Sequence, residues 1–66
     1  MSHYMFRPDG KVVKTSNSGE RQVIPSHLSA QDMMSVGDTY QHPGRAVYQI
    51  QRGGDVRIGA GGTQAR

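Results

Sequence analysis

Closely spaced turn signals constrain this chain more than any other feature of its sequence. Asp-Gly, Pro-Gly and Gly-Gly dipeptides stand at 9–10, 43–44 and 53–54, and the residues around them alternate between apolar and polar types. Alternation over short segments predicts β-strands, because successive side chains of a strand point to opposite faces. We therefore expect a mainly β fold whose short strands are joined by tight turns.

The chain is too short and too poor in large apolar residues to build a deep core. It has 66 residues, of which 11 are Leu, Ile, Val or Phe, and its net charge is +3. A domain of this size buries only roughly 60% of the surface of its unfolded chain. Small domains usually gain stability from disulfides, metals or assembly, and this chain has no cysteine. Docking on a partner, or pairing of two copies, is therefore expected.

The segment "YMFRPDGKVVKT" predicts a β-hairpin, because its Asp-Gly dipeptide is a strong signal for a hairpin turn. A two-residue loop pairs Phe6 with Val13. A three-residue loop with Gly10 in the left-handed region pairs Phe6 with Val12 instead. The turn is predicted, and both registers remain open.

The segment "RQVI" predicts a short strand that ends before Pro25, because proline cannot donate to a sheet ladder. The following "SHLSAQDMMSVG" is the candidate helix, and we expect one helical turn over residues 29–36. Ser29 is the expected N-cap with Asp32 completing a capping box, and Gly37 is the expected stop. The expected apolar side of this turn holds Ala30, Met33 and Met34.

The segment "RAVYQIQR" predicts the longest strand, and "DVRIG" predicts its partner. A two-residue Gly-Gly turn pairs Ile50 with Arg57, whereas a three-residue loop pairs Ile50 with Ile58 and keeps apolar side chains together. We favour the second register, with Phe6 and Tyr48 filling the core. Residues 1–58 are the expected domain, and residues 59–66 are the expected flexible, Gly-rich tail.

Residues 35–51, "SVGDTYQHPGRAVYQIQ", combine a hydrophobic-Gly-Asp step with a His-Pro turn. This stretch of 17 residues resembles the opening of small SH3-like or Tudor-like barrels, including those attached to some DNA helicases and those in RNA polymerase interaction modules. The resemblance carries over no functional residue. The expected fold is therefore a small curled antiparallel sheet or an SH3-like open barrel, with four or five short strands and one short helical turn.

No motif in the chain indicates a catalytic, metal or cofactor site. His3, His27 and His42 lack the spacing that places two imidazoles on one metal ion. The chain has no G-x-S-x-G motif, and "GGDVRIGAGG" lacks the Lys-Ser/Thr ending and the following helix of a phosphate-binding loop. We expect a protein that is not an enzyme and uses no cofactor or metal.

The two ends of the chain are basic and its middle is acidic. Residues 1–15 carry a net charge of +2, residues 16–44 carry −2, and residues 45–66 carry +3. Basic side chains beside aromatic ones are typical of surfaces that bind single-stranded nucleic acid. The candidate residues for binding nucleic acid or a partner are Arg45, Arg52, Arg57, Lys11, Lys14 and Tyr40.

These observations favour a small non-catalytic binding or adaptor module that docks on a protein partner or larger complex, as a regulator or inhibitor. Met33 and Met34 are the expected partner interface, because methionine adapts to varied surfaces. The alternative is a weak, largely sequence-independent nucleic-acid-binding protein that uses Arg45, Arg52 and Arg57. The chain has neither a signal-peptide pattern nor an apolar run of membrane-spanning length, so we expect a cytoplasmic protein without a membrane partner.

Overall fold

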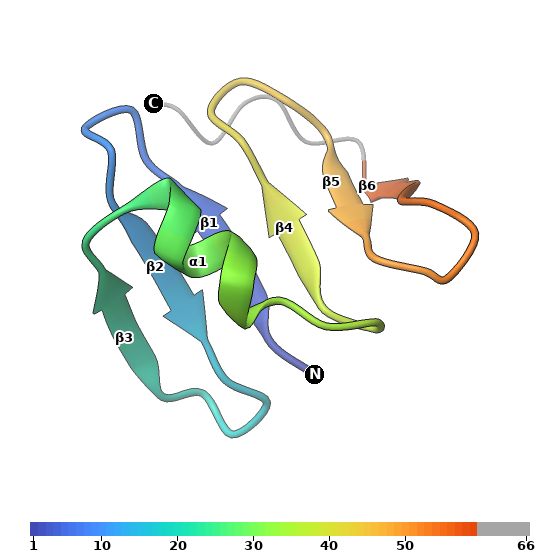
Figure 1. Ribbon diagram of the computed structural model, residues 1–66, viewed down its shortest axis with the longest axis horizontal. Coiled ribbons are helices and arrows are strands. Elements are labelled where there is room, and N and C mark those ends of the chain that lie inside the picture. The colour runs from blue at the N-terminus through green and yellow to red at the C-terminus, as the bar shows by residue number, and fades with distance from the viewer. Residues whose placement is uncertain (60–66) are drawn as a thin grey trace.

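The computed structural model describes residues 1–59, which form a six-stranded sheet with one helix on one of its faces (Figure 1). The elements, in chain order, are β1 (His3–Phe6), β2 (Val12–Thr15), β3 (Arg21–Ile24), α1 (His27–Met33), β4 (Thr39–Gln41), β5 (Val47–Gln49) and β6 (Val56–Gly59). The strand order is β3-β2-β1-β4-β5-β6, and the described sheet is open. The expected mainly β fold is confirmed. It has six strands, where four or five were expected.

The predicted tail lies almost entirely outside the described residues. Gly59 is the last residue of β6, and it pairs with Val47. A Cβ atom at Gly59 would lie 3.0 Å from the Val47 Cβ, so glycine allows the two strands to approach closely. The expected flexibility of residues 60–66 stays a prediction.

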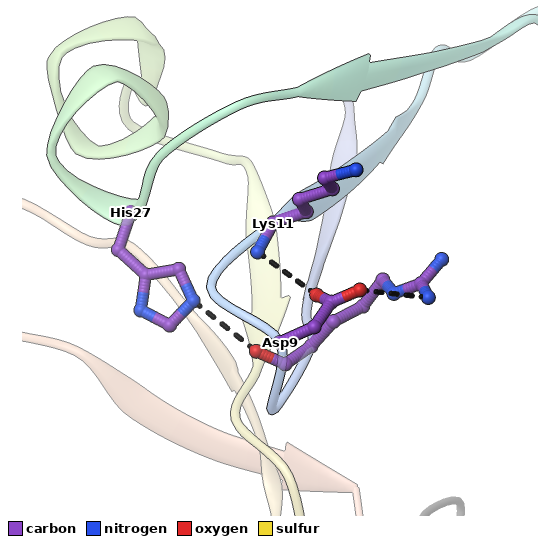
Figure 2. A network of polar contacts seen from close by, with 4 residues as sticks. Asp9, Lys11 and His27 are labelled. Carbon is purple, nitrogen blue, oxygen red and sulfur yellow. Dashed lines mark hydrogen bonds and ion pairs between the residues drawn. The ribbon is translucent and has the colours of Figure 1, made fainter.

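The first hairpin has the three-residue loop. Phe6 pairs with Val12, and Gly10 takes a φ of 92°. The Asp9 carboxylate stabilises the turn, because it accepts a hydrogen bond from the Lys11 backbone N–H at 3.0 Å and forms an ion pair with Arg7 at 2.9 Å (Figure 2). The second hairpin uses the same design, with "SNSGE" as its turn and its glycine at a φ of 94°.

The helix connects two parallel strands of the sheet. β3, β1 and β4 run in the same direction, and α1 carries the chain from β3 at the sheet edge back to β4 beside β1. Parallel strands need a crossover of this kind, which a helix usually provides. An antiparallel sheet was expected, and the β1–β4 pair departs from it. The crossover places α1 over β1 and β2 (Figure 1).

The helix begins and ends earlier than predicted. Its N-cap is Ser26, whose hydroxyl accepts a hydrogen bond from the Ser29 backbone N–H at 3.1 Å. The predicted cap at Ser29 is therefore wrong. The serine directly after Pro25 is the N-cap, so the helix begins about one turn earlier. The helix ends at Met33, and Gly37 takes its φ of 101° in the turn before β4 rather than at the helix stop.

The core lies between α1 and the first three strands. Its members come from the first thirty residues: Tyr4, Phe6, Val12, Ile24 and Ala30. Met34 and Tyr40 are partly buried and pack against this cluster. The prediction that Phe6 is core is confirmed, whereas Tyr48 is only half-buried and lies outside the cluster.

A buried carboxylate joins the start of the chain to the loop after α1. Asp38 is 7% exposed and accepts hydrogen bonds from the backbone N–H of Ser2 at 2.8 Å and of Ser35 at 3.1 Å. Buried polar groups need such partners, since an unsatisfied donor in the interior is costly. The Gly-Asp step of the sequence therefore has a structural role here.

The last hairpin has neither of the predicted registers. Tyr48 pairs with Arg57, and a bulge follows on the way to the Val47–Gly59 pair. Ile50 has left β5: its backbone N–H donates to the Asp38 carbonyl at 2.9 Å, and its carbonyl accepts from the Gly37 N–H at 2.9 Å. Ile50 therefore pairs with the segment before β4, and the loop that connects β5 to β6, residues 50–55, is longer than expected.

Within residues 1–59, the structure contains no helix that is long and apolar enough to cross a membrane.

Candidate functional site

Aromatic rings gather where β4 and β5 leave the cover of α1. We call the group Tyr40, His42, Pro43, Arg45, Ala46 and Tyr48 the aromatic surface. The strand register explains why its tyrosines meet: Tyr40 pairs with Tyr48 across the β4–β5 ladder, and directly opposite residues share one face of a sheet. Tyr4, on the other side of Tyr40, lies beneath α1 and donates its hydroxyl to the Met33 carbonyl.

The rings of the aromatic surface have a regular arrangement. Tyr40 and Tyr48 are nearly parallel, with 16° between their planes and 5.8 Å between their centroids. His42 stands edge-on to Tyr40, at 78° and 5.7 Å. These are the offset-stacked and T-shaped geometries that aromatic pairs prefer, so the rings hold one another in place.

The turn between the two strands follows directly from its residues. The Arg45 N–H donates to the His42 carbonyl at 3.1 Å, and Gly44 takes a φ of 70°. Proline at the second position and a left-handed residue at the third define a type II turn, which needs glycine there. The "HPG" segment therefore positions Arg45 and the His42 ring on either side of the same turn.

Tyr40 is fixed by a carboxylate from the next loop. Its hydroxyl donates a short hydrogen bond to the Asp55 Oδ2. Burial, followed by this hydrogen bond and the nearby negative charge, raises the pKa of Tyr40 to about 12. The phenol is therefore neutral at physiological pH, and its O–H already donates to Asp55.

Two imidazoles lie on Phe6, one from α1 and one from the end of β4. His27 meets the Phe6 ring edge-on at 4.8 Å, and its Nε2 donates to the Arg7 carbonyl at 3.3 Å (Figure 2). His42 lies against the same ring at 4.3 Å. Burial, and then the neighbouring His27 and Arg45, lower the pKa of His42 below its ordinary value of 6.5.

Two hollows share Tyr40 and His42 as a wall. The smaller, of about 330 Å³, lies on the α1 side and reaches Phe6, Met34 and Ile50. The larger, of about 590 Å³, is lined by the aromatic surface itself. Both volumes fall within the range of about 300–1,000 Å³ that is usual for ligand sites.

The structure brings some of the predicted basic residues to this surface. Arg45 lines the larger hollow, and Arg57 shares a sheet face with Tyr48, its cross-strand partner. Arg52 is exposed in the loop between β5 and β6. Within residues 1–59 the recorded ion pair joins Arg7 and Asp9, so these three arginines have no carboxylate partner in the described structure.

The predicted lysines lie in the first hairpin, away from the aromatic surface. Lys11 is exposed beside the first hairpin turn, and the Lys14 ammonium lies 5.7 Å from the centre of the Tyr4 ring. Lys14 belongs to β2, with β1 and β4 between it and β5. Three strand spacings amount to about 14 Å. The basic residues therefore form two groups, and only one of them borders the aromatic surface.

The predicted methionine pair is split by the helix end. Met34 packs against the core, whereas Met33 is 39% exposed. Two other large apolar side chains are also exposed: Leu28 on α1 and Val36 in the loop that follows. We call Leu28, Met33 and Val36 the α1 apolar surface.

The described residues offer binding groups rather than a metal centre. Among residues 1–59, no three His, Cys, Asp or Glu side chains converge as metal ligands would. The sequence interpretation named Tyr40 and Arg45 but missed His42 and Tyr48, because the first was taken as a turn residue and the second as core. Their signal was the placement of Tyr40, His42 and Tyr48 about one Pro-Gly turn.

Comparison with known proteins gave no relative: no family model, curated protein or solved structure matches this chain.

Proposed function

We propose that the chain is a small, non-catalytic, cytoplasmic binding module that docks on a protein partner through the α1 apolar surface. The observation that supports this most is the balance of exposed and buried apolar side chains. Within residues 1–59, seven large hydrophobic residues are exposed, whereas five hydrophobic residues are buried. Large exposed apolar surfaces commonly mark interaction sites.

The helix is the part of this surface that suits docking. It contacts the core mainly through Ala30 and the adjoining Met34, and it presents Leu28, which is 75% exposed, to the outside. An amphipathic helix commonly binds by laying its apolar residues into a groove of the partner. In this role Leu28 and Met33 are the anchors, and the partner supplies an apolar groove. Docking of this kind suits a regulator or inhibitor of a larger protein.

The experiment is affinity capture with the full chain as bait, followed by quantitative mass spectrometry. The test variant replaces Leu28→Gln and Met33→Gln together, which removes apolar surface while keeping good helix formers. The control is Val23→Gln, because Val23 is also a large exposed apolar residue but lies on edge strand β3. Circular dichroism and thermal unfolding establish that all variants are folded.

The proposal expects a partner that wild type and Val23→Gln retain and that the double variant retains at least about tenfold less, since interface anchors are worth about 2 kcal/mol or more. A partner that all three baits retain equally would contradict it. Sedimentation velocity from micromolar to millimolar concentration tests whether the α1 apolar surface pairs instead with a second copy of the chain. Such self-association would also contradict the proposal.

A further inference from the structure

The aromatic surface combines aromatic rings and arginines that protein docking through α1 does not involve. Tyr40, Tyr48 and Arg57 follow one another across β4, β5 and β6 at paired positions on one sheet face. In the other direction the same row continues to Tyr4, which α1 covers, and then to Lys14 on β2. Since α1 lies over β1 and β2 (Figure 1), the row leaves its cover at Tyr40 and ends in an exposed cation.

The ring arrangement at this surface suits a flat aromatic ligand. Tyr40 is held by Asp55, and Tyr48 is stacked nearly parallel to it, so neither ring must be ordered when a ligand arrives. The hollow beside them, of about 590 Å³, is open to the surface, and Pro43 and Ala46 also line it. A flat π-system can stack on Tyr48 there without displacing a packed side chain.

The charges at this surface suit an anion. Arg45 lines the hollow and Arg57 lies beside Tyr48, and neither has a carboxylate partner among residues 1–59. Asp55, the nearby acid, already accepts the Tyr40 hydroxyl. Exposed guanidinium groups flanking a ring are the arrangement that contacts phosphates while a base stacks.

We propose that the aromatic surface binds single-stranded nucleic acid, with a base stacked on Tyr48 in the hollow and with Arg45 and Arg57 on the flanking phosphates. The ligand is a single strand because the bases of a duplex are stacked on each other and cannot reach a ring inside a hollow. Stacking reads no sequence, so binding is largely independent of base identity. This site is separate from the α1 apolar surface.

The test is fluorescence anisotropy with labelled dodecamers of oligothymidine DNA and oligouridine RNA, together with a duplex of the same length. The proposal expects either single strand to bind at low salt and the duplex to bind more weakly. With two phosphate contacts, the logarithm of the binding constant falls with the logarithm of salt concentration at a slope of about −1.4. The DNA and RNA arms decide which strand is preferred.

The variants separate the ring from the charges. Tyr48→Leu weakens single-strand binding by about 5- to 150-fold, whereas Tyr48→Phe keeps the ring and retains binding. Arg45→Ala and Arg57→Ala each bring the salt slope about 0.7 closer to zero. Arg21→Ala is the matched control: it removes an exposed arginine of edge strand β3 that lies outside this surface, and it leaves binding unchanged.

Several results would overturn the assignment: no binding of either single strand at low salt, equal binding of the duplex, or equal losses for Tyr48→Leu and Arg21→Ala. Binding of a proline-rich peptide that depends on Tyr48, with no oligonucleotide binding, would also overturn it and would assign the surface to a peptide. The Leu28→Gln and Met33→Gln variant should bind oligonucleotides like wild type. The two proposals therefore fail separately.

Discussion

The two halves of this small sheet are built differently. Within residues 1–59, the five buried hydrophobic residues all lie in β1, β2, β3 and α1, at positions 4–30. In the half made of β4, β5 and β6, the buried residues are polar, namely Asp38 and Gln41, and apolar residues such as Val56 and Ile58 are exposed. The first half therefore supplies most of the stability, and the second half carries the rings and arginines that can meet a ligand.

This division has a physical basis in the crossover of α1. A helix of seven residues can cover only part of a six-stranded sheet, and it lies over β1 and β2 (Figure 1). The strands that it leaves uncovered cannot bury large side chains on that face. Binding residues commonly lie in such less stable parts of a protein, because a ligand needs access to them.

The largest expected effect comes from emptying the core of the first half. Phe6 is 1% exposed, and Phe6→Ala should lower the free energy of unfolding by about 3–5 kcal/mol. A domain of this size has only about 3–10 kcal/mol to lose, so the variant should be largely unfolded. Urea denaturation followed by circular dichroism measures this. A well-folded variant with a loss under about 1 kcal/mol would show that Phe6 is not the centre of the core.

A smaller loss is expected where the two halves are joined. Asp38→Ala leaves the Ser2 and Ser35 backbone donors without their acceptor and should cost about 1–3 kcal/mol. Asp38→Asn keeps one oxygen acceptor and should cost less. The same urea titration compares the two variants. Equal stability of Asp38→Ala and wild type would mean that this carboxylate does not hold the halves together.

Acid should weaken the fold through a histidine in each half. Burial lowers the pKa of His3 and, together with His27 and Arg45, that of His42. As the pH falls through 6.5, the unfolded chain takes up these protons before the folded chain does, so the free energy of unfolding decreases. Well above pH 6.5 both histidines are neutral in the folded and the unfolded chain, so their contribution to the free energy of unfolding no longer changes with pH.

Thermal unfolding between pH 5 and pH 8 of His3→Gln and His42→Gln assigns this acid effect to one half or the other. Each variant should show a shallower loss of stability below pH 6.5 than wild type. Profiles that run parallel to the wild-type profile would exclude both histidines as its source.

The smallest effect is expected at the exposed end of the second half. Ile58 is 53% exposed, and Ile58→Thr should change the free energy of unfolding by no more than about 0.5 kcal/mol. Urea denaturation again provides the measurement. A loss comparable to that of Phe6→Ala would place Ile58 in a core and would remove the contrast between the halves.

Local chemistry was sufficient to predict much of the first half. The Asp-Gly turn, the end of β3 before Pro25 and the presence of a helix after it follow from the conformational limits of single residues. The loop length did not, because both registers of the first hairpin left Phe6 facing a valine. The position of the helix start depended on which of two serines, Ser26 or Ser29, acts as the N-cap.

The second half was harder to predict because its partners are distant in sequence. The parallel pairing of β1 with β4 is set by the crossover, which no local pattern specifies, whereas the bond between Ile50 and Asp38 extends the β4–β5 register. Ile50 was therefore assigned to the wrong ladder. Tyr48 was assigned to the core because alternation predicts a side chain's face but not whether a helix reaches that far.

Native-state hydrogen exchange, read residue by residue by nuclear magnetic resonance, tests the division between the halves most directly. The amides of β1 and β2 should exchange only through global unfolding, with opening free energies equal to that from urea denaturation. The amides of β5 and β6 should exchange through openings of clearly lower free energy. One common opening free energy for β2 and β5 would contradict the account.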